Sequence, residues 1–188
     1  MPFNLPTLFT LLRILVIPLL VGVFFLPVTW SNEVCTLLFT TAAITDWLDG
    51  YLARRLQQTS AFGAFLDPVA DKLIVVVALV LLVQAIHTPW MAIAAFIIIG
   101  REITISALRE WMAQLGSSGK VAVSMLGKLK TTAQMGALIL LLYRKPIGDF
   151  PTLEVGLGLL FVAAGLTLWS MVVYLMAAWP VVKEQTDA

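Results

Sequence analysis

The chain has 188 residues, of which 60% are hydrophobic and only 12% are charged. A soluble domain averages about 45–50% apolar and about 25% charged residues, so this composition indicates an integral membrane protein. The high hydrophobic content excludes a disordered chain, and the single cysteine excludes a disulfide scaffold. The net charge of +1 argues against a nucleic-acid partner. A spanning helix needs roughly 20 residues, which leaves room for six or seven spans and no soluble domain.

Six apolar segments predict six transmembrane helices. The first is interpreted as a span and not as a signal peptide, because no Lys or Arg precedes it and no small-x-small cleavage site follows it. The predicted fold is all-α, and residues 1–188 form a single integral-membrane domain. The predicted spans are residues 8–26, 34–54, 68–86, 90–112, 121–143 and 152–178.

The basic residues predict the orientation of these spans. With six spans both termini lie on one side, and ten basic residues belong to that side, against only Arg144 and Lys145 on the other. Cytoplasmic loops are enriched in Lys and Arg, so we expect multi-pass insertion with cytoplasmic termini. The ten are Arg13, Arg54, Arg55, Lys72, Arg101, Arg109, Lys120, Lys128, Lys130 and Lys183.

Four aspartates stand at the predicted cytoplasmic ends of the second and third spans. Asp46 and Asp49 are three residues apart, and Asp67 and Asp71 are four apart, so each pair lies on one face of its helix. Pro68 is predicted in the first turn of the third span, where its missing N–H costs little. The connecting loop is short, so we expect the two faces to meet.

Four converging carboxylates would repel one another and could not all ionise without compensating cations. Carboxylate oxygens suit hard divalent ions, so the pattern predicts Mg²⁺ or Mn²⁺. A single acid at a membrane surface is often only a solvated loop charge, but four at helical spacing favour a metal site. Small residues between them would let a bulky ligand approach the backbone, and Arg54 could neutralise a phosphate.

Written out, the segment reads Asp46-x2-Asp49-Gly50-x2-Ala53-Arg54-x8-Gly63-x3-Asp67-x3-Asp71. It resembles the signature of the CDP-alcohol phosphotransferase family at all eight fixed positions. The resemblance covers most of the chain. Beyond the motif, the sequence is similar to bacterial members of the family that use glycerol 3-phosphate as acceptor. The segments that carry this wider similarity are FNLPTLFTLLRILVIPL, GREITISALREWMA and GKLKTTAQM.

The resemblance implies an enzyme that transfers the phosphatidyl group from CDP-diacylglycerol to sn-glycerol 3-phosphate and releases CMP. It implies a homodimer in the bacterial cytoplasmic (inner) membrane, with a cytoplasm-facing active site and two divalent ions. The metal ligands would be Asp46, Asp49, Asp67 and Asp71, and Asp71 would also deprotonate the acceptor hydroxyl. Contacts to the CDP moiety would come from Asn4, Thr7, Gly50, Ala53, Arg54, Ser60 and Gly63.

The acceptor phosphate is a second anion and needs cations of its own. Four candidates lie toward the cytoplasmic ends of the fourth and fifth spans, and Arg suits bidentate phosphate contact whereas Lys acts as a point charge. Two of them, Arg109 and Lys130, fit simple positive-inside anchors equally well. Glu102 and Glu110 could orient the arginines by pairing. The four candidates are Arg101, Arg109, Lys128 and Lys130.

Other functions stay open at this point. Relatives with the same aspartate motif use serine, choline, inositol phosphate or a second phospholipid as acceptor. A small divalent-cation transporter would also place acids inside the membrane. Against it, Arg54 and Ser60 stand beside the carboxylates. A structural membrane subunit would leave the aspartate spacing unexplained.

Overall fold

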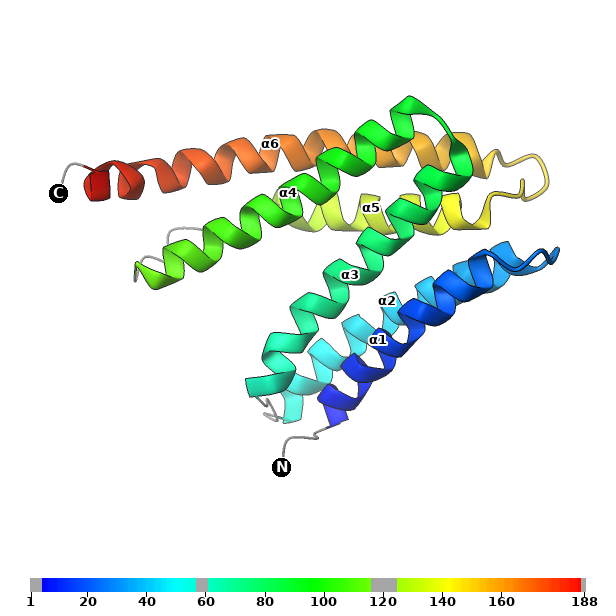
Figure 1. Cartoon of the computed structure of the whole chain (residues 1–188), viewed down its shortest axis with the longest axis horizontal. Helices are drawn as coiled ribbons and strands as arrows, with labels where there is room; N and C mark the ends of the chain where they lie inside the picture. Colours follow the sequence, from blue (N-terminus) through cyan, green and yellow to red (C-terminus); the bar gives the residue numbers. More distant parts are fainter. Residues whose placement is uncertain (1–4, 57–60, 116–124, 187–188) are drawn as a thin grey trace. The chain divides into compact units, whose positions relative to one another are not determined.

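The computed structural model describes residues 5–56, 61–115 and 125–186, and this part of the chain forms six α-helices (Figure 1). For residues 5–7, 47, 49–56, 61, 64, 125–128 and 181–186 the description is limited to the backbone. The predicted all-α fold is confirmed. The helices are α1 (Leu5–Phe24), α2 (Ser31–Leu56), α3 (Ala61–Ile86), α4 (Pro89–Gln114), α5 (Met125–Tyr143) and α6 (Thr152–Thr186).

Three helical segments within the described residues are long and apolar enough to cross a membrane. They are Phe65–Ile86, Pro89–Gln114 and Thr152–Pro180, while Leu8–Phe24 and Leu129–Tyr143 are apolar but shorter. Large apolar side chains stand exposed on the helices, as a lipid-facing surface requires. The chain is therefore a helical membrane protein. Six spans and a cytoplasmic active site stay predictions.

The third helix begins earlier than its predicted span. α3 starts at Ala61, so Pro68 lies inside the helix and the prediction that it occupies the first turn is wrong. The residues before Pro68 are mostly alanine and large apolar side chains, which a helix accepts readily. Proline is tolerated within membrane helices because neighbouring groups satisfy the freed carbonyl. Asp67 and Asp71 therefore belong to one continuous helix on either side of the proline.

The chain forms two compact units, which are described separately. The first comprises residues 1–86 and 138–156, and in it α1 packs against both α2 and α3. Its buried side chains include Leu20 on α1, Phe39 on α2 and Leu82 on α3. Because the three helices run up, down and up, the start of α1, the end of α2 and the start of α3 lie together (Figure 1). The aspartates belong to this end.

Polar contacts join the loops at the opposite end of the first unit. Arg144, with a positive φ of 57°, donates from Nη2 to Asn32 Oδ1 at 2.7 Å, and its guanidinium lies 4.9 Å from the centre of the Phe24 ring. Lys145 Nζ forms an ion pair with Glu33 at the start of α2. The basic pair on the predicted non-cytoplasmic side is thus held by contacts of the α5–α6 connection with the end of α1 and the start of α2.

The second unit comprises residues 87–137 and 157–188. Its helix α4 begins with Thr88 as N-cap, whose side chain accepts a hydrogen bond from the Met91 N–H at 3.3 Å. A buried core joins α4 and α6 through Ile105, Met112, Tyr174 and Ala178. Polar side chains of α4, α5 and α6 lie beside this core.

Candidate active site

Three carboxylates from two helices converge in the first unit. Asp46 on α2 and Asp67 and Asp71 on α3 each present one oxygen, and these oxygens lie within 4.8 Å of one another. The helical spacing puts Asp67 and Asp71 on one face of α3, and the packing of α2 and α3 around α1 brings Asp46 to them. The expected meeting of the two aspartate pairs is thus observed for these three residues.

A buried arginine of α1 reaches all three carboxylates. Arg13 Nη1 lies 3.1 Å from Asp46 Oδ1 and 3.3 Å from Asp67 Oδ1, and it also pairs with Asp71 Oδ1. The Arg13 side chain is fully buried, whereas each carboxylate is about 40% exposed. From the sequence alone, Arg13 was expected only to be one of the basic residues on the cytoplasmic side. An arginine within an otherwise apolar span was the available signal, because such charges need a partner.

The donor set of this cluster fits a hard divalent cation. Every described ligand is a carboxylate oxygen, and the single positive charge of Arg13 offsets only part of the charge of three aspartates. Mg²⁺ and Mn²⁺ prefer such oxygen ligands and retain positions for water or a substrate phosphate. The cluster can therefore combine metal binding with access from solvent, through its partly exposed carboxylates.

For most of the remaining motif residues the structure does not describe the side chain. Gly63 lies on α3 one turn before Asp67 and on the same face. The predicted CDP contacts Asn4 and Ser60 lie outside the described residues. For others the helix is assigned but the side chain is not described: Thr7 on α1, Asp49, Gly50, Ala53 and Arg54 on α2, and Lys128 on α5.

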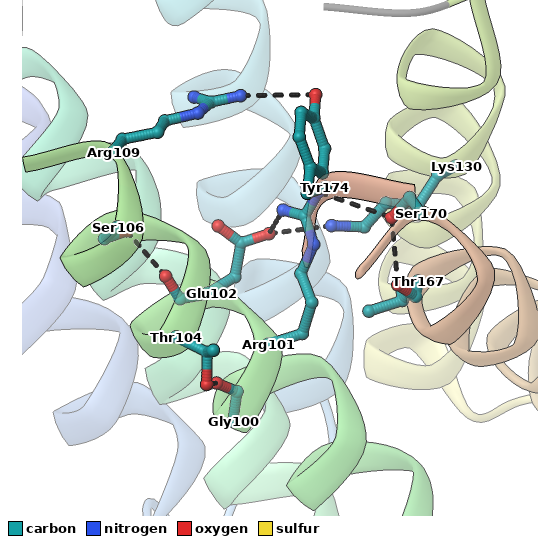
Figure 2. A network of polar contacts seen from close by, with 10 residues as sticks. All are labelled: Gly100, Arg101, Glu102, Thr104, Ser106, Arg109, Lys130, Thr167, Ser170 and Tyr174. Atoms are coloured by element: carbon teal, nitrogen blue, oxygen red, sulfur yellow. Dashed lines mark hydrogen bonds and ion pairs between the residues drawn. The ribbon is translucent and has the colours of Figure 1, made fainter. Parts of the chain in front are cut away.

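A second polar cluster lies in the second unit, built from α4, α5 and α6 (Figure 2). Glu102 Oε1 accepts a hydrogen bond from Arg101 Nη1 at 3.0 Å and another from Lys130 Nζ at 2.7 Å. Arg101 Nη2 donates to Ser170 Oγ at 3.3 Å, and that hydroxyl donates to the Thr167 carbonyl at 2.9 Å. Both cations are buried, with 9% of Arg101 and 4% of Lys130 exposed.

Tyr174 of α6 lies beside two arginines of α4. The guanidinium carbons of Arg101 and Arg109 are 5.6 Å and 5.5 Å from the centre of its ring, and Arg109 Nη2 donates to the Tyr174 hydroxyl at 3.4 Å (Figure 2). Arg101 and Arg109 therefore lie on one face of α4, against the same residue of α6. Tyr174 and Ser170 were not predicted as site residues, although their spacing of four along a helix was the available signal.

The charges of this second cluster do not balance. Arg101, Arg109 and Lys130 bring three positive charges and Glu102 one negative charge. The Nε of Arg101 is buried and has no hydrogen-bond partner among the described residues. A buried donor without an acceptor is costly, and an anionic ligand would satisfy it. The cluster can therefore bind an anion such as a phosphate.

Comparison with known proteins places these features in a family. The sequence profile of CDP-alcohol phosphatidyltransferases matches residues 3–180. Proteins named CDP-diacylglycerol–glycerol-3-phosphate 3-phosphatidyltransferase from Escherichia coli (strain K12) and Shigella flexneri serotype 5b (strain 8401) are 57% identical over 178 residues. The alignments cover 95% of this chain and 96% of each relative. The chain therefore belongs to the CDP-alcohol phosphatidyltransferase family, as the aspartate motif predicts.

Proposed function

We propose that the chain transfers the phosphatidyl group of CDP-diacylglycerol to sn-glycerol 3-phosphate, giving phosphatidylglycerol phosphate and CMP. The observation that carries this proposal is the match to relatives named for that reaction, at 57% identity over nearly their whole length. The aspartate cluster supports it, because phosphoryl transfer depends mostly on positioning and on electrostatic stabilisation. The buried basic cluster supports a phosphorylated acceptor over serine or inositol.

The aspartates would hold the metal. Asp46, Asp67 and Asp71 already present their oxygens to one another, and Asp49 follows Asp46 by one helical turn. Two Mg²⁺ or Mn²⁺ ions, when bound, supply positive charge that offsets the diphosphate of the lipid substrate. The partial exposure of the three described carboxylates leaves room for that substrate.

The transfer is a single displacement. The acceptor hydroxyl oxygen forms a bond to the β-phosphorus, the bond from that phosphorus to the bridging oxygen breaks, and CMP leaves with the bonding electrons. Asp71 takes the hydroxyl proton, because a free hydroxyl is a poor nucleophile near neutral pH. No covalent enzyme intermediate is formed.

The nucleotide and the acceptor bind on different residues. The CDP moiety contacts the small and polar positions of the motif and of the N-terminal segment, while the acceptor phosphate contacts the cations of α4 and α5. The proposed CDP contacts are Asn4, Thr7, Gly50, Ala53, Arg54, Ser60 and Gly63. The proposed acceptor contacts are Arg101, Arg109, Lys128 and Lys130.

The enzyme works as a homodimer in the bacterial inner membrane, with six spans and cytoplasmic termini. The ten-to-two distribution of basic residues supports this orientation. Glycerol 3-phosphate then approaches from the cytoplasm, and the CDP headgroup of the lipid faces the same side while the acyl chains stay in the bilayer.

Identification of the lipid product tests the proposal. Purified protein in detergent micelles is given CDP-diacylglycerol, Mg²⁺ and glycerol 3-phosphate labelled in its carbon chain. The label is expected to enter the lipid fraction as a product that carries one more phosphate than phosphatidylglycerol. The label could instead stay water-soluble while the protein releases CMP with another alcohol. That result would show that the acceptor is not glycerol 3-phosphate, but it would leave the phosphatidyl-transfer chemistry of the family in place.

A further inference from the structure

Glu102 lies between two cations that come from different helices. One of its carboxylate oxygens accepts from Arg101 Nη1 of α4 at 3.0 Å and from Lys130 Nζ of α5 at 2.7 Å (Figure 2). Two positive groups held so close would repel each other without the shared oxygen. Glu102 therefore determines where both cations stand.

Ser170 of α6 holds the second terminal nitrogen of the Arg101 guanidinium. Ser170 accepts from Arg101 Nη2 at 3.3 Å, so each terminal nitrogen of the guanidinium has a partner on the protein. Its Nε remains buried without a partner among the described residues. Orientation by Glu102 and Ser170 thus leaves a defined donor for a ligand.

The charges of the cluster match a phosphate monoester. Among the side chains that the structure describes there, three cations and one carboxylate leave two positive charges. A phosphate monoester carries about −1.5 to −2 near pH 7 and has three acceptor oxygens. Serine and inositol carry no such group, so the balance selects a phosphorylated acceptor.

We propose that Glu102 is a positioning residue for the acceptor site, which holds Arg101 and Lys130 in the arrangement that binds the phosphate of glycerol 3-phosphate. This inference rests on the proposed acceptor site. It differs from a purely electrostatic role, because a carboxylate repels an anionic ligand. If Glu102 affected the phosphate only through its charge, then its removal would tighten acceptor binding. A positioning role gives the opposite sign.

The test compares steady-state constants of Glu102→Gln with those of the unchanged enzyme. The KM for glycerol 3-phosphate is expected to rise about tenfold or more, while kcat and the KM for CDP-diacylglycerol change by less than about twofold. Glu102→Asp keeps the charge and is expected to recover part of the loss. The control is Glu154→Gln, which removes an exposed acid at the start of α6, away from both charged clusters, and should leave all constants unchanged.

An unchanged or lowered KM for glycerol 3-phosphate in Glu102→Gln would overturn the proposal. Arg101→Lys, measured in parallel, separates this result from a failure of the acceptor site itself. If Arg101→Lys raises the KM for glycerol 3-phosphate and Glu102→Gln does not, only the positioning role is lost. If Arg101→Lys instead raises the KM for CDP-diacylglycerol, the acceptor site and the positioning role both fall. Should Glu102→Gln not purify as a folded protein, Glu102→Asp decides, with an expected rise of about threefold.

Discussion

Arg13 supplies from α1 the positive charge that the three described aspartates share, although it lies outside the aspartate motif. The motif spacing predicts the meeting of α2 with α3, because i, i+3 and i, i+4 positions share a helix face. It cannot predict Arg13, whose distance from the aspartates in the chain is bridged only by the packing of α1. The pairing of Glu102 with Lys130 could not be predicted for the same reason, because the two residues are 28 positions apart in the chain.

Replacement of Arg13 by Met tests its structural role. In the presence of a chelator, the variant is expected to lose about 1–3 kcal/mol of stability, because partly exposed carboxylates then repel one another without a counter-charge. Thermal unfolding in detergent measures the loss. Glu110→Gln, which removes an exposed charge of α4, is the control and should unfold near the normal midpoint. Equal midpoints for Arg13→Met and the unchanged protein would contradict the role.

Asp71→Asn tests the proposed general base. Turnover is expected to fall by at least about 10²-fold, because an amide cannot take the hydroxyl proton, while the protein stays folded and monodisperse. CMP release measures turnover, and Asp149→Asn in the α5–α6 connection is the control, since its side chain is exposed in a turn. Activity within tenfold of normal would remove Asp71 from the base role.

Helix existence was predictable, while helix ends were less so. Apolar length predicted all six helices, and α4 begins one residue before its predicted span. The start of α3 was predicted wrongly because proline was taken as a boundary, whereas neighbouring groups allow the helix to continue through Pro68. Arg144 and Lys145 lie on the predicted non-cytoplasmic side, where Lys and Arg are normally rare. Their contacts with Asn32 and Glu33 at the start of α2 explain them, and such contacts between distant parts of the chain are not encoded in local periodicity.

The close approach of α5 and α6 in the first unit depends on Gly156. A Cβ at this position would lie 2.9 Å from Leu141 Cγ and 3.2 Å from Leu140 Cβ. Gly156→Ala is therefore expected to cost about 1–3 kcal/mol through overpacking, measured by thermal unfolding in detergent. Gly158→Ala is the matched control, because nothing lies within 4 Å of its added Cβ. If the two alanine variants unfold at the same temperature, the packing argument fails.

The Glu33–Lys145 ion pair predicts a pH dependence of stability. The hydrogen bond from Lys145 lowers the pKa of the Glu33 carboxyl below its ordinary value. A carboxyl with a lowered pKa in the folded state stabilises fully above its unfolded pKa of about 4.3, and this contribution is lost as the pH falls through the folded pKa.

Glu33→Gln should therefore unfold at a lower temperature than the unchanged protein near pH 6, and the difference should disappear at strongly acidic pH. Melting curves across this range measure it. Glu154→Gln, in which an exposed acid at the start of α6 is replaced, controls for the loss of a surface charge. A difference that grows as the pH falls would have the wrong sign for this pair.

At the scale of the whole molecule, each of the two compact units carries one of the two clusters proposed to bind substrate. The carboxylates with Arg13 belong to the first unit, and the cations around Glu102 belong to the second. The proposed reaction has two anionic substrates, whose diphosphate and acceptor phosphate need separate counter-charges, and the two clusters fit that need. Family membership was predictable from the motif. The part that α6 plays in the second cluster could not be predicted from the sequence and became visible only in the folded structure.

Metal-dependent CMP release tests the central claim most directly. Purified protein in detergent micelles receives CDP-diacylglycerol and Mg²⁺, with glycerol 3-phosphate, serine, inositol or inositol phosphate supplied one at a time. We expect CMP only with glycerol 3-phosphate, and its loss when a chelator removes the metal. Release that persists in chelator would contradict the metal role of the aspartates. No release with any acceptor from folded protein would contradict the enzyme itself and favour transport of a divalent cation.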